Sequence, residues 1–409
     1  MARPDYTKFL SGRANYVEPS PIREMVSRIA KKSRETQVIS FAAGDPDPDV
    51  IPRITYAEIA KEVFEKEKRS VIYTPTEGVP DLVEEVAKFM KSYEKASVEP
   101  GNIVITHGGS QALDLIGRLM INSGDVVLVE NPSYVNTLLA WKHFGARVVG
   151  IPMDENGMKT DVLESTVKKL KSERRVVKLV YTIPTGQNPS GITMSMDRRK
   201  HLLEVASTYD LLVVEDGAYN YLVYEPVEIR SLVSMDTEGR VIFAGTFSKV
   251  LGTGLRVGWL ALPSELAEVF KFAKGPTDMC PSSPSQLIVL YALRRGLFEE
   301  ARKKAIEAYR AKRDLMIKSI EAYMPGLEHT RPVAGMFVLL KLPGTIDAWS
   351  FATELLEKYA VAVIPAAPFY TDESGRSVLR LNFSMPPANL IEEGVKRIAT
   401  LLKERVSSK

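Results

Sequence analysis

Several kinds of residue are scarce in this 409-residue chain, and each scarcity excludes a class of protein. The single cysteine, Cys280, excludes a scaffold held together by internal disulfides. The four histidines show no metal-ligand spacing, so we expect no metal site. No apolar run is long enough to cross a bilayer, and the first residues lack the apolar core of a signal peptide. Together with the lone thiol, this predicts a cytoplasmic protein with no membrane partner.

An excess of charge of one sign is also lacking. The chain has 54 Lys and Arg against 51 Asp and Glu, a net charge of +3 with neutral histidines. The basic runs at 168–171 and 302–304 fall on helical segments with interleaved acids, which is typical of solvated faces. We therefore expect no nucleic-acid partner. The length allows two or three domains at ~150 residues each.

One lysine is placed where its amine could react. Residues 241–244 and 257–262 are apolar runs that predict buried strands, and Lys249 stands in the small-residue turn after the first. A lysine desolvated beside another cation has a lowered pKa and is a good Schiff-base nucleophile. The same segment supplies groups suited to a phosphate: Thr246, Ser248 and Arg256. The pattern points to a phosphorylated aldehyde cofactor, and a surface lysine in a loop is the alternative.

Two earlier turns offer further ligand sites. A strand at 102–106, a glycine turn at 107–110 and a helix at 111–120 make an anion site, because free N–H groups at the helix start point at the ligand. Tyr134 follows a strand at 126–129, at the end where open α/β sheets bind ligands. Ordinary core packing is the alternative for Tyr134.

A carboxylate and an amide complete the pattern. The rigid Pro- and Gly-rich loop at 184–191 carries Asn188, and the apolar strand at 211–214 leads to Asp216. An acid at the end of a buried strand is costly unless it is paired. A protonated pyridine nitrogen is a suitable partner. Tyr219, three residues further, could reach the same ligand.

With these motifs in place, the chain resembles the class I/II aminotransferases of the pyridoxal-phosphate fold-type I superfamily, in particular the 2-aminoadipate/kynurenine aminotransferase branch. The resemblance extends from residues 21–24 to 379–384. Its motifs keep the family's order: Asn-Pro-x-Gly, Asp-x-x-Tyr, and Ser-Lys with an arginine seven residues later. It implies pyridoxal 5'-phosphate as cofactor and ping-pong transfer of an amino group between L-amino acids and 2-oxo acids. The expected substrates are glutamate, 2-aminoadipate, and aromatic or large aliphatic amino acids.

The resemblance assigns roles around the cofactor ring. Lys249 forms the Schiff base with pyridoxal phosphate and then acts as general acid/base. Asp216 keeps the pyridine nitrogen protonated. Tyr219 and Asn188 hydrogen-bond the phenolic oxygen, and Tyr134 stacks on the ring. Lys249, Asp216 and Tyr219 are thus the expected catalytic residues.

The resemblance also indicates which residues bind the cofactor phosphate and the substrate. The expected phosphate ligands are Gly109, Ser110, Thr246, Ser248, Arg256 and, from the partner of a homodimer, Tyr73. The expected substrate-binding residues are Gly44, Asn188, Arg380 for the α-carboxylate, and Arg23 for a distal carboxylate. The alternatives are a helix-capping tyrosine at 73, a snorkelling arginine at 380 and a solvated arginine at 23.

Three positions depart from the family pattern. Gly109 and Thr246 stand where the family commonly has serine, and Ala334 stands where it often has glycine. Gly109 lacks the serine hydroxyl, which a backbone N–H can replace as a phosphate donor. Thr246 retains a hydroxyl, and Ala334 affects substrate specificity.

The predicted fold is α/β. Alternating strands and helices predict a mostly parallel, seven-stranded-type sheet wrapped by helices, with a smaller α+β domain built from both ends of the chain. Residues 1–45 would form an arm, a helix and part of the small domain, 46–297 the cofactor-binding domain, and 298–409 the rest of the small domain. A long helix from Phe298 includes Lys312 through its alkyl stem.

Three alternative functions share part of this pattern. A β-lyase or decarboxylase on the same cofactor needs the same Lys249 and Asp216. A pyridoxal-phosphate-sensing regulator carries an N-terminal DNA-binding domain, and fewer than roughly 50 residues precede the core here. A nicotinamide dehydrogenase is disfavoured because the glycine spacing at 252–258 does not match the dinucleotide fingerprint.

Overall fold

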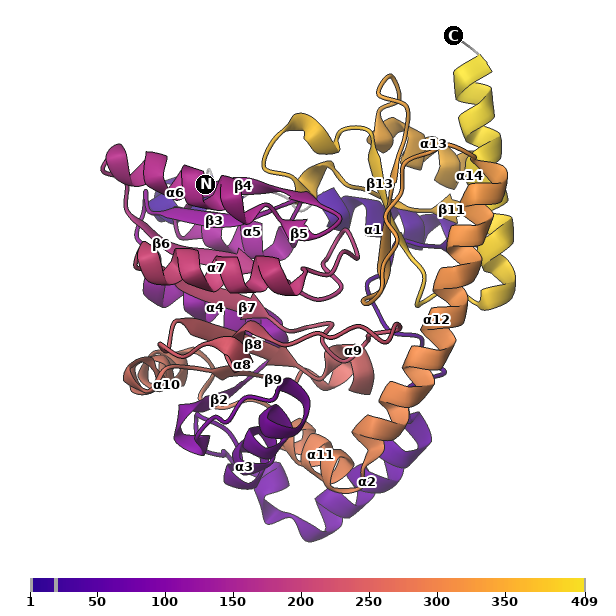
Figure 1. Cartoon of the computed structure of the whole chain (residues 1–409). Coiled ribbons are helices and arrows are strands. Elements are labelled where there is room, and N and C mark those ends of the chain that lie inside the picture. Colours follow the sequence, from indigo (N-terminus) through magenta and orange to yellow (C-terminus); the bar gives the residue numbers. More distant parts are fainter. Residues whose placement is uncertain (1–2, 18–20, 408–409) are drawn as a thin grey trace.

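The computed structural model describes residues 3–17 and 21–407. Its centre is an eight-stranded sheet in the order β2-β9-β8-β7-β6-β3-β4-β5 (Figure 1). The pairs from β4 to β8 through β3, β6 and β7 are parallel, while β9 runs antiparallel to β8 and β2, and β5 folds back on β4. The strands are β2 (Ile103–Thr106), β3 (Val126–Asn131), β4 (Arg147–Asp154), β5 (Gly157–Met158), β6 (Val177–Thr182), β7 (Leu212–Asp216), β8 (Val241–Thr246) and β9 (Gly258–Ala261).

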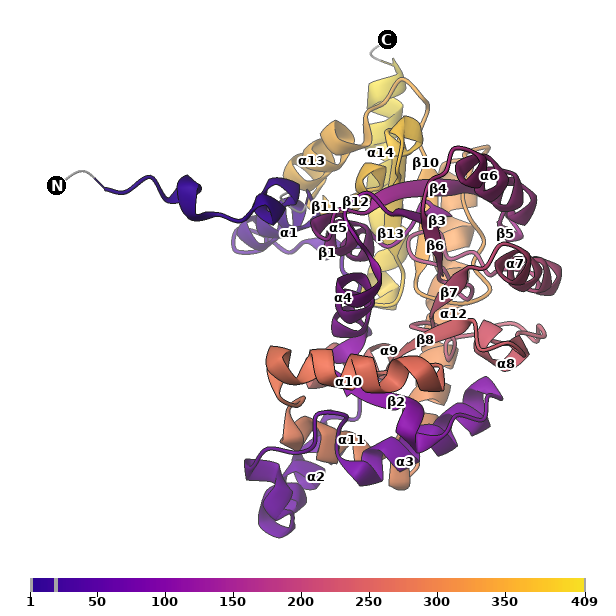
Figure 2. The ribbon, with the colours of Figure 1, turned by 90° about the vertical axis from the view of Figure 1, so that its left-hand side faces the viewer.

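The sheet is covered on both faces, which explains its continuous apolar strands. Side chains alternate along β3, so Val127 and Val129 join one core while Val126 and Leu128 join the other. Figure 2 shows α6 (Thr160–Ser172), α7 (Met196–Thr208) and α8 (Leu232–Met235) on one face. The other face carries α4 (Gly108–Met120), α5 (Val135–His143) and α10 (Ser264–Asp278). The predicted α/β fold with a mostly parallel sheet is confirmed.

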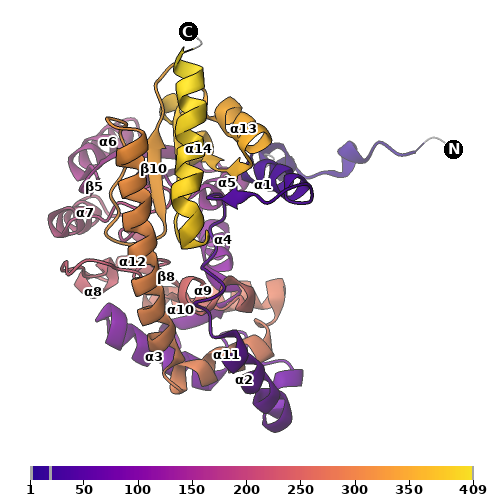
Figure 3. The same ribbon diagram turned by 90° about the vertical axis from the view of Figure 1, so that its right-hand side faces the viewer.

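A second layer joins segments from both ends of the chain. β10 (Phe337–Lys341), β13 (Val378–Asn382) and β12 (Ile364–Pro365) form an antiparallel sheet, and β1 (Ile39–Ser40) pairs in parallel with β11 (Val361–Ala362). The apolar run at 361–364 is therefore divided between two sheets. Around them lie α1 (Pro21–Lys32), α13 (Ala348–Tyr359) and α14 (Ala388–Ser407), and α14 packs beside the long α12 (Leu297–Tyr323), as Figure 3 shows.

The remaining elements are short or peripheral. α2 (Arg53–Lys66), α3 (Pro80–Phe89) and α11 (Ser283–Arg294) pack together at one end of the molecule (Figure 1). α9 (Ser248–Leu251) follows β8. The single turns are η1 (Tyr6–Phe9), η2 (Gly12–Tyr16), η3 (Lys68–Val71), η4 (Met90–Glu94), η5 (Pro100–Asn102), η6 (Thr253–Leu255), η7 (Ala367–Phe369) and η8 (Glu373–Gly375). None of the helices in the described part of the chain is long and apolar enough to cross a membrane.

Candidate active site

A cavity of about 250 Å³ opens where the carboxyl ends of β6, β7 and β8 meet the start of α4. This is the edge of an open α/β sheet at which ligands bind. All the site residues expected from sequence line it except Tyr73 and Arg23: Gly44, Gly109, Ser110, Tyr134, Asn188, Asp216, Tyr219, Thr246, Ser248, Lys249, Arg256 and Arg380. The fold thus brings together residues that are up to 336 positions apart (380 − 44).

Lys249 lies in the first turn of α9, immediately after β8. Its Nζ donates a hydrogen bond to the carbonyl of Gly44 at 2.9 Å. Desolvation in the cavity lowers the pKa of Lys249 to about 8, against the opposing influence of the Asp45 and Asp216 carboxylates. The amine is therefore much more readily deprotonated than an exposed lysine, which is the requirement for attack on an aldehyde.

Asp216 ends β7 and is buried beneath the cavity. The hydroxyl of Tyr181 donates to its Oδ2 at 2.8 Å, and the amide N–H of Ala218 donates to Oδ1 at 3.2 Å. Burial raises the pKa of Asp216 to about 6, so the carboxyl is ionised above that pH. The sequence reasoning missed Tyr181, although its place at the end of the apolar strand β6 was a usable signal.

The turn before α4 and the side chain of Arg256 form a cradle for an anion. Gly108 has a φ of +70°, and a Cβ there would lie 2.6 Å from Nη2 of Arg256. Arg256 donates from Nη2 to the carbonyl of His107 at 3.2 Å and from Nη1 to that of Thr253 at 3.1 Å. The start of α4 adds unpaired N–H groups. A Cβ on Gly109 would meet ordinary contacts, so the position that requires glycine is Gly108.

Two hydroxyls border this cradle from the end of β8. Thr246 Oγ1 donates to Ser248 Oγ at 2.9 Å and accepts the amide N–H of Ser248 at 3.1 Å. Both side chains are buried. Hydroxyls, helix N–H groups and a guanidinium are the donors that proteins use for phosphate.

Arg380 enters the cavity from β13, the central strand of the antiparallel sheet. Its Nη2 donates to the carbonyl of Ala42 at 2.8 Å and its Nη1 to Oδ1 of Asn188 at 3.2 Å. The guanidinium lies 4.4 Å from the ring centre of Phe337 and 5.0 Å from that of Phe369. The side chain is buried, so a snorkelling edge position is excluded.

One donor of Arg380 is left over. Its Nε is buried and has no hydrogen-bond partner among the residues that the structure describes. Buried polar groups are normally paired, and a guanidinium pairs best with a carboxylate through two parallel hydrogen bonds. Since Arg380 lines the cavity, its guanidinium suits a ligand carboxylate.

The loop that carries Asn188 is held by two buried charged residues that sequence reasoning missed. Arg199 of α7 donates from Nη2 to the carbonyl of Pro184 and to Thr185 Oγ1, at 2.6 and 2.9 Å. Glu130 of β3 accepts the amide N–H of Ile183 and the side-chain amide of Gln187, at 3.1 and 3.2 Å. The acid inside the apolar strand β3 was the available signal for Glu130. Arg199 gave none, because it has the sequence context of a solvated helix.

Tyr134 and Tyr219 both face the cavity. The hydroxyl of Tyr134 accepts a hydrogen bond from Asn136 Nδ2 at 2.9 Å, and the ring of Tyr219 lies edge-on to Phe337 at 5.9 Å. The sequence reasoning did not assign the remaining lining residues a place in the site: Ile22, Leu113, Val135, Asn136, Ile183, Ala218, Thr253 and Phe337.

Tyr73 and Arg23 lie outside this cavity. Tyr73 is 78% exposed, in the segment before α3. It does not cap α3, whose first turn has no side-chain cap. Arg23 is exposed on α1, while the preceding residue, Ile22, lines the cavity. Within this chain the cavity is therefore formed without either side chain.

Comparison with known proteins decides the family. The family model for class I and II aminotransferases matches residues 36–398. The chain belongs to the class I and II aminotransferases. It is 39% identical to aromatic-amino-acid aminotransferase 1 of Thermococcus litoralis over 98% of this chain and 96% of that protein.

Two solved structures resemble this aminotransferase over almost its full length. An archaeal alanine:glyoxylate aminotransferase has a TM-score of 0.96 and 52% identity, covering 98% of this chain and 100% of that one. The α-aminoadipate aminotransferase of Thermus thermophilus, complexed with N-(5'-phosphopyridoxyl)-L-leucine, has a TM-score of 0.90 and 31% identity, covering 99% and 100%.

The cofactor of this aminotransferase is pyridoxal 5'-phosphate, as in its family. The residues in the cavity fit that molecule: an amine with a lowered pKa for its aldehyde, a buried carboxylate for its ring nitrogen, and a donor-rich turn for its phosphate. Among residues 3–17 and 21–407, no group of three or more His, Cys, Asp or Glu side chains is arranged to hold a metal ion.

Proposed function

We propose that this enzyme transfers an amino group between an L-amino acid with a large side chain and a 2-oxo acid such as 2-oxoglutarate, by a ping-pong mechanism. The observation that carries the proposal is the buried guanidinium of Arg380, which lines the cavity and whose Nε has no hydrogen-bond partner among the described residues. A guanidinium there binds the α-carboxylate common to all amino acids and 2-oxo acids. Ile22 and Phe337 leave room for an apolar side chain.

Different residues of the chain contribute different functions to the proposed reaction. Bound pyridoxal phosphate supplies the aldehyde that accepts the amino group and the ring that stabilises negative charge at the substrate Cα. Asp216, ionised above pH about 6, keeps the ring nitrogen protonated. Tyr219 and Asn188, which line the cavity, would hydrogen-bond the phenolic oxygen, and Tyr134 would contact the ring.

Lys249 is the proposed general base. Its pKa of about 8 lies near the working pH, where proton transfer is most efficient. With the cofactor bound, the amine of Lys249 would accept the proton from the substrate Cα and serve as the proton donor afterwards. Arg380 holds the carboxylate on one side of the cavity, which fixes the Cα–H bond relative to this amine.

The phosphate ligands are proposed on the same basis. Arg256 and the N–H groups at the start of α4 supply the positive charge for the phosphate. Three further residues line this part of the cavity: Gly109, Ser110 and Thr246. Ser248 adds a further hydroxyl. Gly44, whose carbonyl holds Lys249, lines the substrate side.

An acidic substrate side chain needs one more cation. The cations that line the cavity are Lys249, Arg256 and Arg380, and each has a role above. We assign the distal carboxylate of glutamate or 2-aminoadipate to Arg23, which α1 carries beside the cavity-lining Ile22. A movable arginine can leave when an apolar side chain binds, whereas a fixed buried one would stay unpaired.

The experiment is a donor panel. Phenylalanine, leucine and 2-aminoadipate are each assayed with 2-oxoglutarate, and glutamate is assayed with phenylpyruvate, because glutamate and 2-oxoglutarate would only interconvert. Initial rates are measured at several concentrations of both substrates. We expect all four to react, with the parallel reciprocal plots of a ping-pong mechanism. Intersecting plots, or reaction with none of the four, would contradict the proposal.

Alanine with glyoxylate is the second candidate pair, favoured by the 52% identity to the archaeal alanine:glyoxylate aminotransferase. The same panel decides between them when alanine, glyoxylate and pyruvate are included. A kcat/KM for alanine with glyoxylate far above that of every large donor would establish a small-substrate enzyme.

The proposed enzyme is a cytoplasmic homodimer in which Tyr73 reaches the partner's phosphate site. Val71, Ile72 and Tyr73 are 75%, 59% and 78% exposed, and three consecutive exposed apolar side chains mark a contact surface. The cytoplasmic location is proposed from the lone thiol of Cys280.

A further inference from the structure

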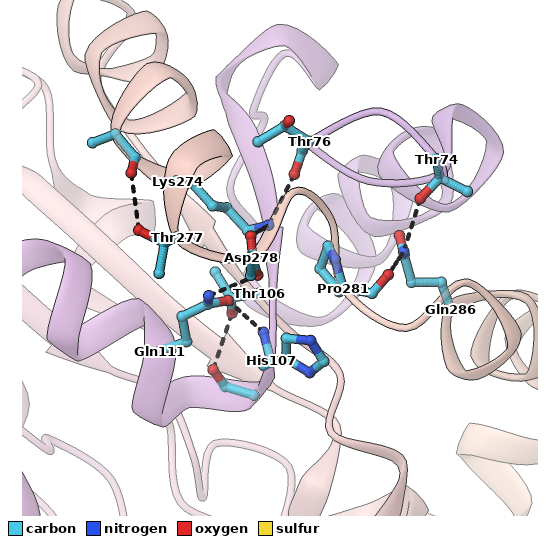
Figure 4. Close-up of polar contacts among 12 residues, drawn as sticks. Thr74, Thr76, Thr106, His107, Gln111, Lys274, Thr277, Asp278, Pro281 and Gln286 are labelled. Carbon is cyan, nitrogen blue, oxygen red and sulfur yellow. Dashed lines mark hydrogen bonds and ion pairs between the residues drawn. The ribbon is translucent and has the colours of Figure 1, made fainter. Parts of the chain in front are cut away.

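A buried lysine stands behind the phosphate cradle, outside the cavity. Lys274 of α10 has no exposed surface. Its Nζ donates to the carbonyl of Thr76 at 3.0 Å and to Oδ1 of Asp278 at 2.9 Å (Figure 4). Lysine is rarely buried so completely, because desolvating an ammonium is costly unless it is fully paired.

The pair continues toward the start of α4. Oδ2 of Asp278 accepts a hydrogen bond from Gln111 Nε2 at 2.7 Å. Oε1 of the same Gln111 accepts the amide N–H of His107 at 2.8 Å, and His107 is the N-cap of α4 (Figure 4). Lys274, Asp278 and Gln111 thus join Thr76 to the turn that carries Gly109 and Ser110. We call these three side chains the α10 link.

The far end of the α10 link is the segment that carries Tyr73. Two α11 side chains hold the same segment: Ser283 donates to the carbonyl of Ile72 at 2.9 Å, and Gln286 Oε1 accepts the amide N–H of Val79 at 2.8 Å. Residues 72–79 are therefore tied on one side to α11 and on the other, through Lys274, to α4.

The backbone where the link leaves α10 is strained. Met279, directly after Asp278, has a φ of +59°, which is unfavourable for a residue other than glycine. Such conformations persist only where the surrounding contacts enforce them. The bonds of Asp278 to Lys274 and Gln111 are contacts of this kind.

We propose that Lys274, acting through Asp278 and Gln111, is a positioning residue for the cofactor phosphate. The link fixes the start of α4, which contacts the phosphate of this chain's own site, relative to residues 72–79, from which Tyr73 would reach the partner's phosphate. Lys274 also neutralises a carboxylate that Gln111 holds near the anion site. The inference depends on the proposed function only in placing the phosphate at the start of α4.

The test compares two ligands that differ in the phosphate alone. Dissociation constants of pyridoxal phosphate and of pyridoxal are measured on cofactor-free enzyme by absorbance, together with the thermal midpoint of each variant. For Lys274→Met we expect pyridoxal phosphate binding to weaken roughly tenfold, the scale of one charge-assisted contact, while pyridoxal binding changes less than about twofold. Gln111→Met cuts the same link from the α4 end and should give the same pattern.

A double variant separates positioning from simple stabilisation. Lys274→Met with Asp278→Leu removes both buried charges, so the thermal midpoint should recover. Phosphate-dependent binding should stay weak, because the link is still broken. Recovery of both quantities would overturn the proposal and leave Lys274 as a stabilising residue.

Two control variants test whether the effect is specific to the α10 link and whether the phosphate site is correctly placed. Lys178→Met removes another lysine–aspartate pair, with Asp125 at 2.7 Å at the amino-terminal ends of β6 and β3, and should leave the binding of both ligands unaffected. Arg256→Met should weaken pyridoxal phosphate but not pyridoxal. If it does and Lys274→Met does not, the α10 link has no positioning role; if neither does, the phosphate site itself is misplaced.

Discussion

Arg380 gives the sharpest test of how the substrate is held. Replacing it by methionine removes the planar fork that we expect to bind the α-carboxylate. Two charge-assisted hydrogen bonds at ~1.5–3 kcal/mol each amount to ~3–6 kcal/mol, or about 10²–10⁴-fold in kcat/KM. The guanidinium donates one N–H to Ala42 and one to Asn188, so Nε–H and one further N–H on each η nitrogen remain for a ligand.

The assay uses a pair of donors that differ only in the carboxylate. For wild type and Arg380→Met, the rate at which cofactor absorbance decreases in a single turnover is measured with phenylalanine and with 2-phenylethylamine. The loss should fall on phenylalanine alone, because the amine has no group for Arg380 to bind. The rate with 2-phenylethylamine also shows how far activity falls because the Ala42 carbonyl and Asn188 Oδ1 lose their hydrogen-bond donor in the variant.

An equal loss with both donors would refute this reasoning. It would show that Arg380 supports the loop of Asn188 and does not read the substrate. Arg380→Lys separates charge from geometry, since lysine keeps the charge but cannot form the bidentate pair. We expect it to lie between wild type and Arg380→Met.

The remaining predictions concern the ring, the dimer and the side-chain pocket. Cofactor binding should weaken as pH falls through about 6, because Asp216 becomes neutral there, and Asp216→Ala should abolish this dependence in a titration with pyridoxal phosphate. Mixing inactive Lys249→Ala chains with inactive Tyr73→Ala chains should restore some activity through heterodimers; an active monomer at assay concentration would exclude the crossing. Arg23→Ala should lower kcat/KM for glutamate roughly ten- to hundredfold and leave phenylalanine nearly unchanged, and equal losses would limit Arg23 to supporting α1.

Part of the cavity lining could be predicted because several functional residues follow a strand. Strands at β6, β7 and β8 are marked by apolar runs, and the polar residue at the end of each run is brought to the same sheet edge. Asn188, Asp216 and Lys249 were found in this way. Their assigned roles, like the domain boundaries at 45 and 297, stay predictions.

Contacts between residues far apart in the chain could not be predicted from the sequence. Whether the apolar segment at 361–364 joins one sheet or two depends on the partners β1 and β13, which lie far away in the chain. Lys312 was expected to contribute its stem to the core, yet its ammonium is buried as well and pairs with Asp47 at 2.6 Å. Arg199 and Lys274 show the same limit, because a buried cation in a helix has the same local pattern as a solvated one.

The identity of the reactive amine is the central claim, and one measurement tests it. The enzyme loaded with pyridoxal phosphate is reduced with borohydride, which traps the cofactor on the amine that holds it, and the peptides are mapped by mass spectrometry. The account predicts a single pyridoxyl label on Lys249, and none on a folded Lys249→Ala variant. A label on any other lysine, or an unchanged yield with Lys249→Ala, would contradict it.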